Sequence, residues 1–183
     1  MENKTDLRIW AKSLRKTLPL DAISAKIVRK IRQNPEFQQA KNVLLYSPSK
    51  YEINLLALLD EDKNFFLPKV NGKELLICPF KKGDVLEISS FNIKEPCSNP
   101  VDPCCLDLAI VPALAADKNC FRLGYGGGFY DRFLAQNKVK TITPVARQLL
   151  IEKLPVELAN LIAAGEVVDY GLNIFVKFLR LLT

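Results

Sequence analysis

Three short apolar segments constrain the fold of this chain more than any other feature of its sequence. They are "NVLLYS" at 42–47, "DLAIVP" at 107–112 and "TITPVA" at 141–146, with polar residues around them. A short, almost continuous apolar run of this kind is typical of a strand buried on both faces, which occurs mainly in parallel sheets. Helical segments alternate with such strands along the chain. We therefore expect an α/β protein with three layers, α/β/α, around a largely parallel sheet.

Amphipathic helices are predicted before the first strand, and a hairpin is predicted after it. Apolar residues recur at helical spacing within 7–18 and again within 23–31. The segment 53–62 also predicts a helix, and the Asn-Gly pair at 71–72 indicates a hairpin turn between two strands. The segment 89–105 contains three prolines and little periodicity, so we expect a surface connection there.

The whole chain, residues 1–183, is expected to form one domain, because its 49% hydrophobic content suits one α/β unit with a sizeable core. Five cysteines without a C-x-x-C arrangement are typical of a reducing compartment. Charges recur every few residues near the start, and no 18-residue apolar run occurs. We therefore expect a cytoplasmic protein without a membrane partner.

The charged residues limit the chemistry that this chain can perform. A formal net charge of +6 suits an anionic partner such as nucleic acid, a phosphate ester or a polycarboxylate, without choosing among them. The sequence contains no histidine, which excludes imidazole from acid–base catalysis and from metal binding. Proton and metal chemistry must therefore depend on carboxylates, lysine, tyrosine or cysteine.

The segment "FRLGYGGGFYDRFL" at 121–134 contains four of the eight glycines and lies between a predicted strand and a predicted helix. Backbone N–H groups in such a segment can converge on an anion, assisted by the N-terminus of the helix. The glycines do not form a Walker loop or a G-x-G-x-x-G motif, and a tight turn would explain them equally well. Arg122, Asp131 and Arg132 favour a site for phosphate and Mg²⁺.

The stretch "RLGYGGGFYDRFL" resembles the signature of the 5-formyltetrahydrofolate cyclo-ligase family, also called methenyltetrahydrofolate synthetase. The resemblance covers roughly residues 4 to 157, and from about 158 the chain departs from the family pattern. Six other segments resemble the family in the right order: "KTDLR" (4–8), "YSPSKYEIN" (46–54), "LPKV" (67–70), "IKEP" (93–96), "LDLAIVPALAAD" (106–117) and "RQLLIEKLP" (147–155).

The resemblance implies a fold similar to the NagB/RpiA/CoA-transferase-like fold. It also implies ATP-dependent conversion of 5-formyltetrahydrofolate to 5,10-methenyltetrahydrofolate, with ADP and phosphate as further products and Mg²⁺ as cofactor. The partners would be these two substrates, with no nucleic acid and no membrane, and the protein would be a monomer.

Site residues follow from the same resemblance. Catalytic roles are implied for Lys4, Arg122 and Tyr130. The implied ATP-binding residues are Lys4, Arg8, Arg122, Leu123, Gly124, Tyr125, Gly126, Gly127, Gly128, Phe129 and Tyr130. The implied folate-binding residues are Ser47, Glu52, Tyr125, Gly126, Gly127, Gly128 and Phe129. The implied Mg²⁺ ligands are Asp131 and Asp169, the latter only if the chain has an insertion relative to the family.

Each of these residues also has a structural interpretation. Lys4 and Arg8 would equally form the solvated face of a helix, and Asp131 would equally cap one. Glu52 would equally be an exposed residue near a helix start, and Phe129 would equally anchor a helix in the core.

Alternative functions remain open at this stage. A basic nucleic-acid-binding module would fit the net charge, although the sequence contains no nucleic-acid-binding motif. A sugar-phosphate isomerase or CoA-transferase relative would use the glycine segment for phosphate, with Glu52 or Asp131 as base. A cyclo-ligase fold that has lost its activity is a third alternative.

Overall fold

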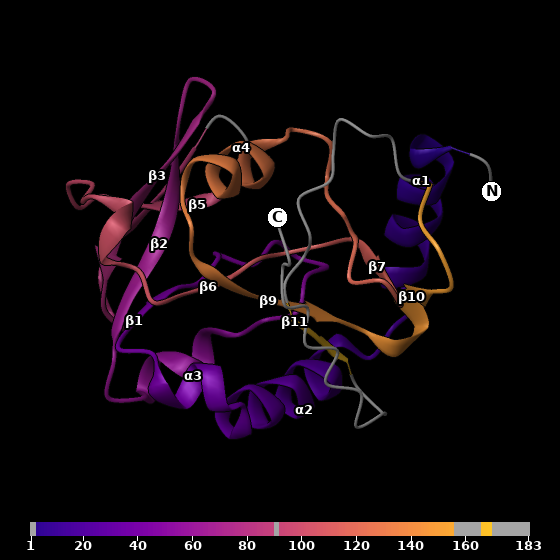
Figure 1. Ribbon diagram of the computed structural model, residues 1–183, viewed down its shortest axis with the longest axis horizontal. Helices are drawn as coiled ribbons and strands as arrows, with labels where there is room; N and C mark the ends of the chain where they lie inside the picture. The colour runs from indigo at the N-terminus through magenta and orange to yellow at the C-terminus, as the bar shows by residue number, and fades with distance from the viewer. Residues whose placement is uncertain (1–2, 90–91, 156–165, 170–183) are drawn as a thin grey trace, which may run out of the picture.

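The computed structural model describes residues 3–89, 92–155 and 166–169, and a six-stranded sheet forms its centre (Figure 1). All neighbouring strands of this sheet are parallel except the hairpin of β2 and β3. The three predicted strands and the largely parallel sheet are therefore confirmed. In order across the sheet, the strands are β11 (Glu166–Asp169), β9 (Lys140–Val145), β6 (Leu108–Ile110), β1 (Asn42–Leu44), β2 (Asn64–Asn71) and β3 (Glu74–Phe80).

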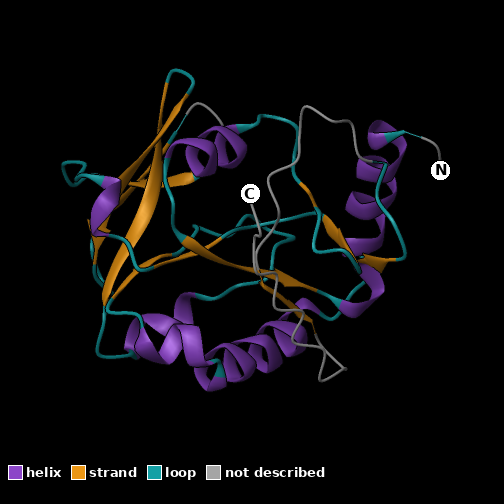
Figure 2. Cartoon of the chain, viewed as in Figure 1, coloured by secondary structure: helices purple, strands orange, loops and turns teal. Residues whose placement is uncertain are grey.

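Helices cover both faces of this sheet (Figure 2). In the view of Figure 1, α2 (Leu20–Gln33) and α3 (Pro35–Gln39) lie below the sheet, and α4 (Phe129–Gln136) lies above it. The first helix, α1 (Lys4–Arg15), lies at the opposite end of the molecule from the β2–β3 hairpin. In the part of the chain that the structure describes, no helix is long and apolar enough to cross a membrane.

Alternate side chains of the central strands enter different cores, as the geometry of a strand requires. Val43 packs with the apolar residues of α1 and α2, whereas the adjacent Leu44 packs with Phe133 of α4. Leu108 and Ala109 of β6 divide between the two cores in the same way. Burial on both faces explains why these strands have nearly continuous apolar sequences.

Two segments differ from their predicted structure. Residues within 53–62 form the short 3₁₀ helix η1 (Leu56–Asp60) instead of an α-helix, because Asn54 accepts a hydrogen bond from the backbone N–H of Leu56 and starts a tighter turn. The predicted surface connection 89–105 contains β5 (Lys94–Pro96), which pairs with β4 (Leu86–Ile88) and packs against β2. Strands of three residues are too short to show an alternating pattern.

A small second sheet separates β6 from the glycine segment. It consists of β10 (Leu150–Ile151), β7 (Ala115–Asp117) and β8 (Arg122–Leu123). The glycine segment therefore lies between a strand, β8, and a helix, α4, as predicted, but two further strands separate it from the buried strand 107–112. At the end of β7, the buried Asp117 carboxylate accepts hydrogen bonds from three backbone N–H groups, those of Asn119, Phe121 and Leu154, each at 2.9 Å.

We expect Asp117→Asn to destabilise the protein, because an amide NH₂ would face at least one of these backbone donors. A buried donor left without an acceptor costs about 1–3 kcal/mol, and urea unfolding should show a loss of that size in the free energy of unfolding. The exposed Asp62, changed to Asn, provides the control. Equal stability of the two variants would show that the carboxylate contributes nothing at this turn.

Candidate active site

A cavity of about 770 Å³ lies where the loops after β1 and β8 meet the first turns of α1 and α4. Tyr46 and Ser47 follow β1 on one side, and Pro112 follows β6. The cavity is therefore at the carboxyl ends of neighbouring parallel strands, which is where α/β sheets commonly hold ligands.

The structure brings together on this cavity every site residue that the family resemblance implied and whose side chain it describes: Lys4, Arg8, Ser47, Glu52, Arg122, Leu123, Gly124, Tyr125, Gly126, Gly127, Gly128, Phe129, Tyr130 and Asp131. Asp169 ends β11, where its backbone pairs with Val145 of β9. Its side chain lies outside the described residues, and so does the departure from the family pattern after residue 158.

Glycine is needed at three consecutive positions for two different reasons. Gly126 has φ +108° and Gly128 has φ +67°, both in the left-handed region that other residues rarely adopt. At Gly127, a Cβ atom would lie 2.9 Å from two ring carbons of Phe129. Gly128 is also the N-cap residue of α4, so the helix begins directly after the glycine segment.

Two arginines of α1 hold the glycine segment from the other end of the sequence. Arg8 donates from Nε to the carbonyl oxygen of Gly124 at 3.0 Å. Arg15, which is 4% exposed, donates to the Tyr125 hydroxyl at 2.5 Å and also to the carbonyl of Ala113. Sequence analysis missed Arg15, because an arginine in a basic amphipathic helix gives no sign that it is buried.

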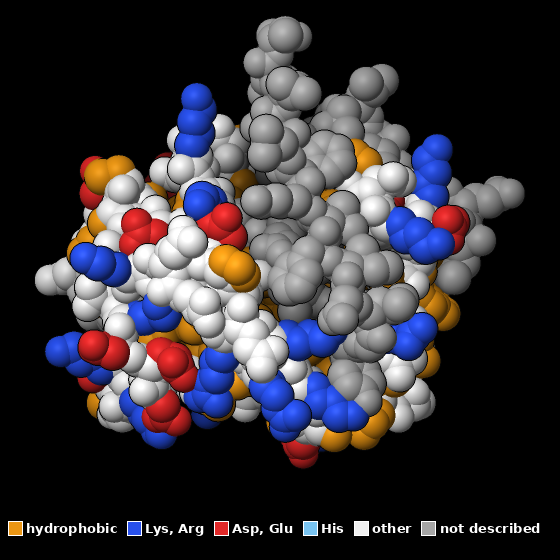
Figure 3. Space-filling model, turned by 60° about the horizontal axis from the view of Figure 1, so that its bottom comes forward, with side chains coloured by type: hydrophobic (Ala, Val, Ile, Leu, Met, Phe, Trp, Pro, Cys, Tyr) orange, Lys and Arg blue, Asp and Glu red, His pale blue; other side chains and the backbone are white. Residues whose placement is uncertain are grey.

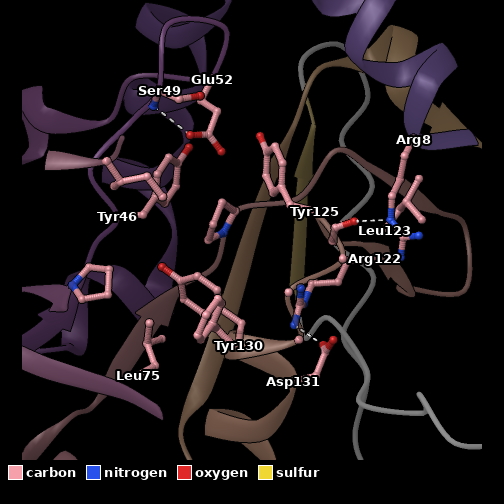
Figure 4. Close-up of a pocket in the computed structure, with 18 of the residues that line it drawn as sticks. Arg8, Tyr46, Ser49, Glu52, Leu75, Arg122, Leu123, Tyr125, Tyr130 and Asp131 are labelled. Carbon is pink, nitrogen blue, oxygen red and sulfur yellow. Dashed lines mark hydrogen bonds and ion pairs between the residues drawn. The ribbon is translucent and has the colours of Figure 1, made fainter. Parts of the chain in front are cut away.

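Arg122 and Asp131 form an ion pair at the start of α4 (Figure 4). The side chain of Arg122 is 4% exposed and that of Asp131 is 41% exposed. Burial lowers the pKa of the Arg122 guanidinium, and the charge of Asp131 opposes this shift. Nε of Arg122 is buried and has no partner among the described residues. Asp131 makes no capping hydrogen bond, so its interpretation as a helix cap is wrong.

Arg132 does not belong to this cluster, contrary to expectation. Its Nε donates to the backbone oxygen of Lys73 at 2.9 Å, and its guanidinium lies 5.1 Å from the centre of the Phe129 ring. It is absent from the described lining of the cavity. Arg122 and Arg132 are only ten residues apart in the sequence. Because Arg122 lies in β8 and Arg132 in α4, their side chains point in different directions.

Glu52 lies among tyrosines at another part of the cavity. Its carboxylate accepts a hydrogen bond from the backbone N–H of Ser49 at 2.8 Å, and Figure 4 shows it between the hydroxyls of Tyr46 and Tyr125. Burial raises the pKa of Tyr46, Tyr125 and Tyr130, and the negative charge of Glu52 raises each further. These phenols are therefore hydrogen-bond donors at neutral pH.

The β4–β5 hairpin contributes cavity residues that sequence analysis missed. Asn92, Ile93 and Glu95 all line the cavity, although 89–105 was expected to be a surface connection. Glu95 is 7% exposed. The "IKEP" segment contains this residue, but its position within a resembling segment did not reveal that it is buried in the cavity wall.

The fold and the cavity together define a mixed α/β protein with a large site in which cationic side chains and a glycine-rich loop face carboxylates and tyrosines. The model of the 5-formyltetrahydrofolate cyclo-ligase family matches residues 2–161. This chain therefore belongs to the 5-formyltetrahydrofolate cyclo-ligase family, and the predicted resemblance is confirmed.

Individual relatives agree with this assignment. The chain is 33% identical over 128 residues to a probable 5-formyltetrahydrofolate cyclo-ligase of Schizosaccharomyces pombe, covering 64% of this chain and 63% of the relative. It is 34% identical over 137 residues to the 5-formyltetrahydrofolate cyclo-ligase of Haemophilus influenzae, covering 67% and 72%.

The fold is similar to that of solved structures as well. The NMR structure of 5,10-methenyltetrahydrofolate synthetase from Aquifex aeolicus superposes with a TM-score of 0.80 at 30% sequence identity, covering 91% of this chain and 89% of that one. A synthetase structure from Mycoplasma pneumoniae, 21% identical, has the same fold with a TM-score of 0.66.

Proposed function

We propose that this protein closes 5-formyltetrahydrofolate to 5,10-methenyltetrahydrofolate at the expense of ATP, releasing ADP and phosphate. The observation that carries the proposal is that one cavity contains both a wall suited to phosphates and a carboxylate-and-tyrosine wall suited to a pterin. Family membership and the names of the relatives support it.

The ATP phosphates would bind at the glycine segment. Lys4 and Arg8 approach it from α1 and Arg122 from β8, so that three cationic side chains line the cavity around Gly126–Gly128. The N-terminus of α4 adds its partial positive charge at the same place. ATP-binding roles follow for the remaining segment residues, Leu123 to Tyr130.

The folate would bind on the opposite side, with its pterin near Glu52. A carboxylate accepts hydrogen bonds from the amino and ring N–H groups of a pterin, and Ser47, Tyr125 and Phe129 line the cavity beside it. Tyr125 is held by Arg15, so its ring is positioned before any ligand binds.

The chemistry needs activation of a poor electrophile. Phosphorylation of the formyl oxygen makes the formyl carbon reactive toward N10, and phosphate then leaves. Arg122 and Lys4 would stabilise the charge on the transferring phosphoryl group. The buried Tyr130 hydroxyl has no partner among the described residues and would donate to an oxygen of the reacting group. We therefore propose Lys4, Arg122 and Tyr130 as catalytic residues.

Asp131 fits a role as ligand of Mg²⁺. One of its oxygens is bonded to Arg122, and the side chain remains 41% exposed at the cavity. Proteins often hold Mg²⁺ through one or two carboxylates together with substrate phosphates and water. Within the described ranges no group of three metal-ligating side chains exists, so a phosphate-dependent site is the arrangement that fits. The ion would neutralise phosphate charge, and we propose Asp169 as its second carboxylate.

We further propose that residues 1–183 form a single domain with the NagB/RpiA/CoA-transferase-like arrangement and that the protein is a cytoplasmic monomer without nucleic-acid partners. All five cysteines are free, which suits a reducing compartment. On the face shown in Figure 3, Lys and Arg side chains at the left lie beside Asp and Glu side chains, and several others lie along the lower edge. Size-exclusion chromatography with light scattering tests the monomer.

The test of the proposed reaction is the absorbance of the methenyl product when protein, 5-formyltetrahydrofolate, ATP and Mg²⁺ are mixed. Product should form only with ATP and Mg²⁺ present, with one phosphate released per product. Equal product without ATP would overturn the proposal. Salt-dependent binding of DNA or RNA without turnover would support the nucleic-acid alternative instead.

We expect Glu52→Gln to weaken folate binding by about ten- to a hundredfold, because an amide leaves at least one pterin N–H poorly matched at a cost of about 1–3 kcal/mol. ATP affinity measured without folate should stay at the wild-type value. Calorimetric titration of each ligand provides the measurement, and Glu152→Gln, at an 80% exposed side chain, provides the control. Loss of both affinities would indicate a disturbed fold. Loss of neither would show that the pterin does not bind at Glu52.

A further inference from the structure

Glu95 is a buried carboxylate in the wall of the cavity to which the proposed reaction has so far given no role. It lies in the middle of β5, is 7% exposed and lines the cavity. Its side-chain carboxylate makes no hydrogen bond or ion pair with any residue in the described ranges. The strands beside it contribute apolar side chains to the same cavity, Pro68 and Val70 from β2 and Leu75 from β3.

Such a carboxylate is costly unless something outside the protein binds it. The other buried or cavity-lining carboxylates are already bonded within the protein. Asp117 accepts from three backbone N–H groups, Glu52 accepts from Ser49, and Asp131 pairs with Arg122. Of the three carboxylates that line the described cavity, Glu95 is the one whose oxygens are uncommitted.

Ring closure requires an acceptor for one proton. The lone pair of N10 forms the new bond to the formyl carbon, the bond from that carbon to the phosphorylated oxygen breaks, and the N10–H bond must also break. The tyrosines are unsuitable, since a phenol is protonated at neutral pH and burial raises the pKa of Tyr46 and Tyr125 further. The chain has no histidine.

We propose that Glu95 accepts the N10 proton during ring closure, an inference that rests on the proposed function. The carboxylate takes the proton as N10 attacks, and then passes it to the departing phosphate, which leaves as the trianion and needs one proton to become hydrogen phosphate. The proton and the electrons balance, and no further reactant is needed.

Charged and titratable groups from three strands surround β5. Lys69 of β2 and Cys78 of β3 lie close enough that the charges of Lys69 and Glu95 act in opposite directions on the pKa of the Cys78 thiol. Glu87 of β4 is the cross-strand partner of Glu95, but it is exposed to water. Lys69 is therefore a cation close to this part of β5.

The test is Glu95→Gln, which keeps the size of the side chain and removes the base. Turnover should fall about 10²–10⁴-fold, the usual contribution of a general base, while the affinities for ATP and for folate each stay within about threefold. The melting temperature should equal or exceed that of the wild type, because a buried charge without a protein partner has been removed. Acetate should restore part of the activity of Glu95→Ala, and Glu87→Gln is the matched control.

The outcomes separate the two proposals. If the wild type forms no methenyl product, the proposed function fails and this inference fails with it. If the wild type is active and Glu95→Gln turns over normally, the inference alone is overturned. A Glu95→Gln variant that fails to fold, or that loses folate affinity in proportion to turnover, would show that Glu95 is a structural or binding residue and would also overturn it.

Discussion

The Asp131→Asn variant is expected to lose turnover by about two orders of magnitude. The asparagine keeps an oxygen that can accept a hydrogen bond from Arg122, but it removes the negative charge that pairs with this 4% exposed guanidinium and that a hard dication requires. A loss of about 3 kcal/mol of transition-state stabilisation corresponds to a rate reduction of this size. Because Asp131 has no capping bond to lose, α4 itself should remain intact.

Two measurements distinguish the roles of this carboxylate. Turnover as a function of Mg²⁺ concentration should require much more of the ion in the variant than in the wild type. The melting temperature should fall modestly, since a buried arginine loses its ionic partner. Asp60→Asn is the control, because Asp60 forms a surface ion pair with Lys82 at a 51% exposed side chain. A variant that turns over normally at ordinary Mg²⁺ would assign Asp131 to structure alone.

The Gly127→Val variant is expected to lose ATP affinity by a hundredfold or more, about 3 kcal/mol. Backbone strain is not the reason, because Gly127 lacks the positive φ of its two glycine neighbours. The reason is steric: the first side-chain carbon would lie 2.9 Å from the Phe129 ring, and two further methyl groups add to the clash. Phe129 is the first residue of α4, so displacing it should move the helix N-terminus away from the proposed phosphate site.

Calorimetric titration with ATP measures this effect, and Gly83→Val is the matched control. Gly83 has φ +99° with open space around it, so valine there strains the backbone without touching the cavity. The control should lose stability but retain ATP affinity. If Gly127→Val folds and binds ATP as tightly as the wild type, the glycine segment is only a turn.

The sheet could be predicted from sequence because its strands are buried on both faces and therefore appear as unbroken apolar runs. The helices could be predicted because one stripe of each is buried, as Leu7 and Ala11 of α1 illustrate. The β5 strand and η1 could not, because neither is long enough to repeat a pattern. Their conformations depend on contacts with β2 and on the side chain of Asn54.

The cavity residues also divide into those that could be predicted from the sequence and those that could not. Those of the glycine segment form a contiguous motif, so their positions followed from the resemblance. Arg15 and Glu95 gave no local signal, since each is buried by residues distant in sequence. Arg132 shows the reverse case: it lies inside the motif, yet tertiary structure directs it toward Lys73.

The bonds from Arg8 and Arg15 to the glycine segment join residues 116 and 110 positions apart in the sequence. Local detachment of α1 would break both bonds and remove Lys4 and Arg8 from the cavity in one event. A ligand that spans α1 and the glycine segment binds only the docked state, so its binding free energy adds to the cost of that opening. Amide hydrogen exchange in α1 should therefore slow when a ligand occupies the cavity, although the glycine segment lies more than a hundred residues later in the sequence.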